Sequence, residues 1–260
     1  LAAAVGADYS YAVTPAWAAF LGSEVRGRAY RHEGDFKSIA GEARTGAVWT
    51  SGQQQVRLTG GYNRFKQEGQ APGDPKPTND RSTALVSADY RFALNERQQF
   101  NVGIAGTRVK FLTNNIEDFD ATTVTAGYLH AFERKGSPLV QVSGFYSRDE
   151  AVRKLADGVS DKSKRVAGVR SYFQYSLTES LAWFNGLGYS RRNDQSAFAR
   201  ATEIEFGRDR LADLTFGVNW RFQQKCAMRA QWFASRNDSN IAIYDFTRHE
   251  ISSTIRCDFQ

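Results

Sequence analysis

The chain has 260 residues, of which 41% are hydrophobic, and a formal net charge of +6. Its mean hydropathy of −0.52 is too polar for a bundle of membrane-spanning helices, and the sequence has no run of about 18 apolar residues that could form one such helix. The positive charge does not indicate nucleic-acid binding, because the arginines are spread along predicted strands and no nucleic-acid-binding motif is present.

Polar and apolar residues alternate through most of the chain, which predicts β-strands. In one clear case Leu214, Phe216 and Trp220 share a face, with Asp213 and Arg221 on the other. Many of these strands are long enough to cross a bilayer, which takes about 9–11 tilted residues. The predicted strands are 3–12, 17–31, 38–50, 54–66, 82–94, 98–112, 121–133, 138–149, 164–177, 180–192, 211–223, 226–237 and 247–259.

The predicted connections alternate between short turns and long polar loops. The short ones are 13–15, 51–53, 95–97, 134–137, 177–179 and 223–225, and the long ones include 67–81, 113–120, 151–163, 193–210 and 237–246. Short periplasmic turns and long external loops are typical of outer-membrane barrels. The sequence therefore predicts an all-β fold, a transmembrane antiparallel β-barrel in the outer membrane of a Gram-negative bacterium, with residues 1–260 as one barrel domain.

The predicted strand count is odd, whereas single-chain bacterial barrels have an even number of strands. We therefore expect about 14 strands, about 13 of them within this chain and one upstream of Leu1. The alternative is that two strands were merged or one was missed. With an upstream strand, the chain would be the C-terminal part of a longer protein.

One face of the predicted strands carries charged side chains of both signs. If the apolar face contacts lipid, this polar face lines the lumen. Two interpretations remain open: ion pairs that brace the wall, or an arginine-rich conduit that favours anions. The arginines predicted to line the lumen are Arg26, Arg28, Arg44, Arg57, Arg91, Arg170, Arg221, Arg229 and Arg256.

Cys226 and Cys257 are the only cysteines. The midpoint between them falls in the loop that joins the last two predicted strands, so an antiparallel hairpin can place them opposite each other near the periplasmic rim. Paired strand residues lie within disulfide range, and the periplasm is oxidising. A disulfide is the preferred interpretation, and two unpaired apolar side chains are the alternative.

The sequence gives little indication of an enzyme. His32, His130 and His249 are the only histidines, and His130 falls on the predicted outward face. His249 with Ser252 or Asp245 is the one catalytic pairing that the sequence offers. No hydrolase, phosphate-binding or zinc-protease motif is present, and no cofactor or metal is expected.

The segment from Ser235 to Ile251 resembles the last hairpin of the surface lipoprotein assembly modifier family. In that family an S-N-I-x-x-Y-x-aromatic-x-R element joins the final two strands. The matching residues are Ser239, Asn240, Ile241, Tyr244, Phe246 and Arg248. The resemblance implies a fourteen-stranded barrel preceded by a periplasmic helical-repeat domain, and residues 1–260 show no such repeats. Related polysaccharide-secretion barrels can end similarly.

The resemblance also implies a function and partners. The expected role is to help lipoprotein or protein substrates reach the cell surface. A secretion conduit for an anionic polysaccharide is the alternative, followed by a passive porin. The expected partners are outer-membrane lipids, the cargo and the β-barrel assembly machinery. That machinery would recognise the final strand, with Ile255, Cys257 and Phe259 as the signal.

Overall fold

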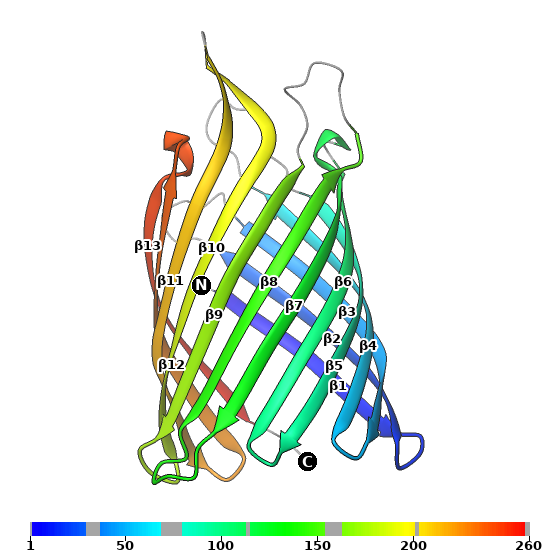
Figure 1. The fold of residues 1–260 in the computed structure, drawn as a ribbon, viewed down its shortest axis with the longest axis vertical. Coiled ribbons are helices and arrows are strands. Elements are labelled where there is room, and N and C mark those ends of the chain that lie inside the picture. Colours follow the sequence, from blue (N-terminus) through cyan, green and yellow to red (C-terminus); the bar gives the residue numbers. More distant parts are fainter. Residues whose placement is uncertain are drawn as a thin grey trace. The chain divides into compact units, whose positions relative to one another are not determined.

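A computed structural model describes residues 2–29, 37–68, 80–112, 115–153, 163–200 and 203–257. These residues form thirteen strands in one antiparallel sheet, and each strand pairs with the next in sequence (Figure 1). The described residues contain no helix that is long and apolar enough to cross a membrane. Contacts divide the chain into two units, which are considered separately: residues 1–91, 103–124 and 147–164, and residues 92–102, 125–146 and 165–260.

The strand boundaries agree with the predicted ones to within two residues, except between β10 and β11. Two short 3-10 helices, η1 (Asn115–Glu117) and η2 (Ala242–Tyr244), lie in long connections. The strands are β1 (Ala2–Ala12), β2 (Trp17–Ala29), β3 (Lys37–Ser51), β4 (Gln54–Glu68), β5 (Arg81–Asn95), β6 (Gln98–Phe111), β7 (Phe119–Ala131), β8 (Leu139–Ala151), β9 (Lys164–Ser176), β10 (Leu181–Arg200), β11 (Glu203–Gln223), β12 (Cys226–Ser239) and β13 (Phe246–Cys257).

The loop predicted over residues 193–210 is wrong. β10 continues to Arg200 and β11 begins at Glu203, with a register shift between Asn193 and Ala197. In Figure 1 this hairpin (yellow) extends past the ends of β12 and β13. A strand that extends beyond the apolar part of a sheet needs no apolar face, so its sequence loses the alternation that predicts strands.

In the first unit the register of β1–β4 separates polar from apolar side chains. Asp8 pairs with Gly22, which pairs with Arg44, so these positions share one face. On the other face Val5 is 80% exposed, and Leu21 and Ile39 are also exposed. Exposed apolar side chains in a contiguous row indicate a surface that lipid or a partner covers, since a core in water would bury them.

The second unit repeats this arrangement. Asp213 and Thr215 share a face with Ser235, and on the opposite face Phe216 and Ile251 are exposed, Ile251 to 84%. Phe184 is the one large side chain that is completely buried among the described residues, and its register partner Gly217 places it on the polar face. In both units the polar face carries the packed side chains, and the apolar face is exposed.

Candidate functional site

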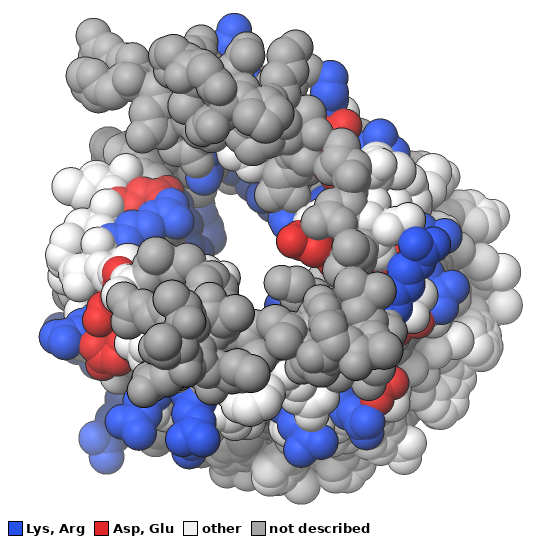
Figure 2. Space-filling model, turned by 90° about the horizontal axis from the view of Figure 1, so that it is seen from above, with Lys and Arg blue, Asp and Glu red and all other residues white. Residues whose placement is uncertain are grey.

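The polar face carries all nine of the arginines predicted to line a lumen. The registers and local contacts place Arg26, Arg28, Arg44, Arg57 and Arg91 there in the first unit, and Arg170, Arg221, Arg229 and Arg256 in the second. Several arginines are near carboxylates: an Arg44 Nη lies 2.9 Å from Asp8 Oδ1, and Arg26 Nε donates to Glu24 Oε1 at 2.9 Å. Figure 2 shows basic and acidic side chains next to each other. Some of these arginines therefore brace the sheet.

Polar-face arginines lie over phenylalanine rings at several places, and at three of them the ring also covers a glycine of the next strand. We call these three groups aromatic stacks. In the first, the Arg57 guanidinium carbon lies 4.3 Å from the centre of the Phe20 ring. Phe20 is the register partner of Gly46, and a Cβ at Gly46 would lie 2.5 Å from the ring. Glycine is therefore needed for the ring to lie flat on the strand.

The second aromatic stack has the same register in the other unit. Phe184 pairs with Gly217, and the Arg229 guanidinium carbon lies 4.0 Å from the ring centre. Gly217 pairs with Gln231 on β12, and Gly46 pairs with Thr59 on β4. In each stack the arginine precedes this partner residue by two positions on the same strand. Each stack fixes a cation on the polar face through a cation–π contact.

The third aromatic stack consists of Phe145, Gly168 and Arg170. A Cβ at Gly168 would lie 2.6 Å from the Phe145 ring, and Arg170 lies 5.2 Å from the centre of that ring. Here the arginine and the glycine are on the same strand, β9.

Next to the second and third stacks, the polar face has a recess of about 660 Å³. Gly186 and Gly188 line it and leave room that larger side chains would fill. The Tyr172 ring stacks against Phe184 with 6.0 Å between the ring centres. The full lining is Gln141, Ser143, Arg170, Ser171, Tyr172, Gly186, Leu187, Gly188, Asp213, Thr215 and Phe233. It offers two aromatic rings, hydrogen-bonding groups and one charge of each sign.

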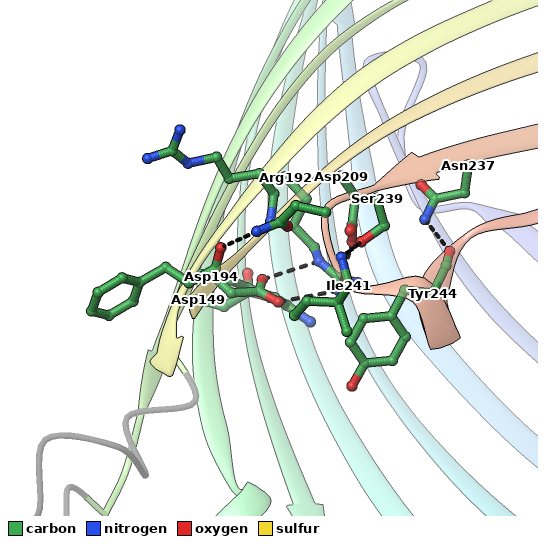
Figure 3. Close-up of polar contacts among 12 residues, drawn as sticks. Asp149, Arg192, Asp194, Asp209, Asn237, Ser239, Ile241 and Tyr244 are labelled. Carbon is green, nitrogen blue, oxygen red and sulfur yellow. Dashed lines mark hydrogen bonds and ion pairs between the residues drawn. The ribbon is translucent and has the colours of Figure 1, made fainter. Parts of the chain in front are cut away.

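At the long-loop end of the second unit, Arg192 lies between two carboxylates (Figure 3). Its Nη2 is 2.7 Å from Asp209 Oδ2, and its Nε is 3.0 Å from Asp194 Oδ1. Asp209 is only 3% exposed. Burying a carboxylate is costly unless it is paired, so removal of Arg192 would leave an uncompensated charge. In the first unit, Lys164 Nζ lies 3.4 Å from Asp149 Oδ2, and Asp149 is also buried.

Four of the six residues that carry the family resemblance hold the last long connection in place. Asn240 Nδ2 donates to the Phe206 carbonyl at 2.9 Å, and the Arg208 backbone N–H donates to Asn240 Oδ1 at 2.7 Å. Ser239 Oγ accepts a hydrogen bond from the Ile241 backbone N–H at 3.0 Å, and the Ile241 side chain is buried.

The same connection is also held at its far end. Asn237 Nδ2 donates to the Tyr244 carbonyl at 2.6 Å, and the Arg192 guanidinium lies 5.6 Å from the centre of the Tyr244 ring (Figure 3). Residues 240–245, which we call the η2 connection, are therefore attached to both β11 and β12.

Comparisons with known proteins reveal similarity in fold. No family model matches the chain, and no curated protein matches it. OmpT of Vibrio cholerae, described as outer-membrane expressed, aligns over 90% of this chain and 79% of its own, with 11% identity and a TM-score of 0.51. This chain has an outer-membrane β-barrel fold.

Two further structures align over most of the chain with lower scores. A bacterial polysaccharide outer membrane secretin covers 98% of this chain and 91% of its own at 10% identity, with a TM-score of 0.49. The translocator domain of the autotransporter NalP from Neisseria meningitidis covers 95% and 89% at 14% identity, with a TM-score of 0.39. The sheet topology and the OmpT alignment confirm the predicted antiparallel β-barrel fold, and the fourteenth strand stays a prediction. The exposed apolar face of this barrel is the face that lipid covers in the outer membrane of a Gram-negative bacterium.

The two cysteines of the barrel are joined by a disulfide. Cys226 and Cys257 are register partners, with an S–S distance of 2.06 Å and 4.2 Å between the Cα atoms. They link β12 to β13 at the short-turn end, on the face that also carries Met228 and Ile255. The disulfide adds a covalent link to the last hairpin of the barrel.

The structure separates His249 from Ser252, whereas the alternative pairing of His249 with Asp245 stays a prediction. His249 stacks on Trp232 on the apolar face, whereas Ser252 shares the polar face with Gln231, so their suggested pairing is wrong. His130 lies on the apolar face as predicted, within 3.2 Å of the Tyr128 hydroxyl. His32 lies outside the described residues, and no three His, Cys, Asp or Glu side chains in those ranges could hold a metal ion.

Several polar residues of the barrel were missed from the sequence. Asp194 and Asp209 fall in the predicted loop over residues 193–210, and Arg192 is the last residue of the predicted strand before it, so the three were not expected to lie together. The aromatic stacks were missed for another reason: Phe20 and Phe184 are apolar residues on the polar face, and only the register shows the glycine beneath each ring.

Proposed function

We propose that this barrel assists the export of lipoprotein or other protein substrates to the cell surface and that it is not an enzyme. The η2 connection carries the proposal. Each of Ser239, Asn240, Ile241 and Tyr244, which carry the family resemblance, makes a defined contact that fixes this connection. Four of the six residues that carry the resemblance therefore make one local structure.

In this proposal the polar face lines the passage for the cargo. The aromatic stacks hold Arg57, Arg170 and Arg229 against rings, so these cations stay in place as cargo moves past. Carboxylates such as Asp8 and Glu24 lie among the arginines, so a polypeptide of either charge meets partners without one strong binding site.

A secretion conduit for an anionic polysaccharide is the second candidate, and the recess on the polar face favours it. Tyr172 provides a ring on which a sugar could stack, Gln141 and Ser143 provide hydrogen-bonding groups, and Arg170 provides a cation. A passive porin would need none of these features in particular. In either case outer-membrane lipids surround the barrel, and the β-barrel assembly machinery inserts it.

The cargo can be identified by comparing surface proteins with and without the gene. Intact cells of the wild-type strain, a deletion strain and a complemented strain are treated with proteinase K, and lipoproteins are quantified by mass spectrometry before and after. We expect one or more lipoproteins to become protease-resistant in the deletion strain at unchanged total abundance. If every lipoprotein stays equally accessible, the export proposal is wrong.

The second candidate makes a different prediction in the same strains. A polysaccharide conduit predicts less cell-surface uronic acid in the deletion strain with unchanged lipoprotein accessibility. Conductance of the purified full-length protein in planar bilayers is a further check. A large conductance that an anionic oligosaccharide blocks would favour the polysaccharide, whereas a small conductance agrees with a passage that opens only for protein cargo.

A further inference from the structure

Charged side chains stand on the apolar face near the long-connection ends of the strands. In the first unit they occur as ion pairs between neighbouring strands or along one strand. Arg108 Nε lies 2.7 Å from Asp120 Oδ1, and Arg148 Nη2 lies 2.5 Å from Glu150 Oε1. Each of these arginines has its own carboxylate, so their charge is compensated within the protein.

The second unit differs at the corresponding end of β10–β12. Arg191 on β10 is the direct register partner of Arg210 on β11. Two residues before Arg210, Arg208 lies on the same face of β11 and pairs with Asn193. Arg236 lies on the same face of β12. We call Arg191, Arg208, Arg210 and Arg236 the arginine cluster, and all four side chains are exposed.

The arginine cluster is short of negative charge. Its nearest carboxylate by register is Asp238, which pairs with Arg210 across the strands and is bound by Arg236, whose Nε lies 2.9 Å from Asp238 Oδ1. Among the described residues neither Arg191 nor Arg210 forms an ion pair. Like charges directly opposite each other on a sheet are destabilising, and an external anion would reverse this effect.

The position of the arginine cluster indicates the kind of anion. Two residues further along β10, Tyr189 is 48% exposed on the same face, and Leu187 follows with 56% exposure. A ligand that contacts both the arginine cluster and these two side chains needs an anionic headgroup joined to apolar chains. Long connections lie on the outer side of bacterial barrels, so this ligand belongs to the outer leaflet.

We propose that the arginine cluster binds the phosphate groups of the phosphorylated glycolipid in the outer leaflet. Guanidinium groups suit phosphate because they donate two parallel hydrogen bonds in a fixed plane. Arg191 and Arg210 would share one phosphate from opposite sides, and Tyr189 would contact the sugar or the first part of the acyl chains. This proposal depends on the outer-membrane fold and not on the nature of the exported cargo.

The test measures binding of lipid A to the full-length protein in detergent by native mass spectrometry. The probes are bisphosphorylated lipid A, the same lipid with both phosphates removed, and inorganic phosphate alone. We expect the wild-type protein to bind the bisphosphorylated lipid at least about tenfold more tightly than the dephosphorylated one, because each cationic side chain near the headgroup adds to the attraction. Inorganic phosphate alone should bind weakly, since it lacks the chains that contact Tyr189 and Leu187.

Two sets of variants distinguish the effect of the arginine cluster on lipid binding from the effect of basic side chains in general. Arg191→Gln with Arg210→Gln should remove most of the preference for the bisphosphorylated lipid. Arg148→Gln is the matched control because Arg148 lies on the same face but already has Glu150 as a partner. The proposal is overturned if the double variant keeps the preference, or if the control variant loses it equally.

A measurement on the wild-type protein alone guards against a double variant that does not fold. Raising the salt concentration should weaken binding of the bisphosphorylated lipid and leave the dephosphorylated lipid unaffected, because salt screens exposed charges. Equal binding of the two lipids at all salt concentrations would overturn the proposal without any substitution.

Discussion

Arg229 lies over the ring of Phe184, with 4.0 Å between the guanidinium carbon and the ring centre, and Phe184 is completely buried although it is on the polar face. The ring rests on Gly217 and stacks against Tyr172. A large apolar side chain thus forms a small core inside the polar face, and the arginine covers it.

Replacing Phe184 with alanine should destabilise the barrel strongly. The substitution removes a fully buried ring and leaves Arg229 without the surface on which it lies, so we expect a loss of about 3–5 kcal/mol in the free energy of unfolding. Denaturant unfolding of the protein in phospholipid vesicles, followed by tryptophan fluorescence, measures this change. Phe20→Ala is the control: Phe20 occupies the equivalent stack but is only half-buried, so its loss should cost less. Equal losses for both variants would contradict the role given to burial.

The glycine beneath the ring gives a second prediction. A Cβ at Gly217 would lie 2.5 Å from the Phe184 ring and equally close to the Ala230 carbonyl oxygen, so Gly217→Ala must displace the ring or the backbone. We expect lower stability in the same assay. Gly106→Ala is the matched control, because a Cβ there meets no atom within 4 Å. Its expected effect is neutral or stabilising by about 0.4–1 kcal/mol, since alanine restricts the unfolded chain. A neutral Gly217→Ala would show that the ring is not held against the strand.

The sequence predicts the strands well where one face must be apolar. Leu214, Phe216 and Trp220 alternate with polar residues because lipid covers one face and not the other, and this pattern fixes both the strand and its orientation. Beyond that region no face has to be apolar, so the sequence predicts an end of β10 at Arg192 and a start of β11 at Leu211, eight residues short of the observed Arg200 and Glu203. The site is less predictable, because the partners of Arg44 and Arg229 come from other strands. Asp8 can be identified as the partner of Arg44, and Phe184 as the partner of Arg229, only when the register of the strands is known.

The disulfide should stabilise the short-turn end of the last hairpin. Cys226 and Cys257 are 31 residues apart, and a link that closes a loop of this length is worth about 3–4 kcal/mol in the chain-entropy model. Replacing both cysteines with serine should increase amide hydrogen exchange in β13 near residue 257 more than near residue 246. The η2 connection keeps the other end of the hairpin attached in both proteins. Uniform exchange along β13 in the variant would contradict this local role.

The η2 connection should depend on Asn240. Asn240→Ala removes the hydrogen bonds to Arg208 and Phe206, which contribute about 1 kcal/mol each. We expect proteinase K to cut within residues 240–245 of the variant much faster than in the wild-type protein reconstituted in vesicles. Asn240→Asp keeps the acceptor for the Arg208 N–H and loses the donor, so its cleavage rate should be intermediate. If Asn240→Ala is cut no faster than the wild type, other contacts hold the connection.

The last strand should determine how much barrel reaches the membrane. Ile255 is 64% exposed on the apolar face, so Ile255→Asp places a charge against lipid, where charged residues are destabilising. Thr254→Asp is the matched control because Thr254 is the partner of Arg229 on the polar face and meets no lipid. We expect a reduced amount of Ile255→Asp protein in purified outer membranes and nearly normal amounts of the control.

Phe259 lies outside the described residues, but the resemblance makes it part of the signal for the assembly machinery, so Phe259→Asp should also reduce the amount. If Phe259→Asp leaves the amount of barrel in the outer membrane unchanged while Ile255→Asp lowers it, the last strand acts through its contact with lipid. Recognition of the terminal aromatic residue is then not required for insertion.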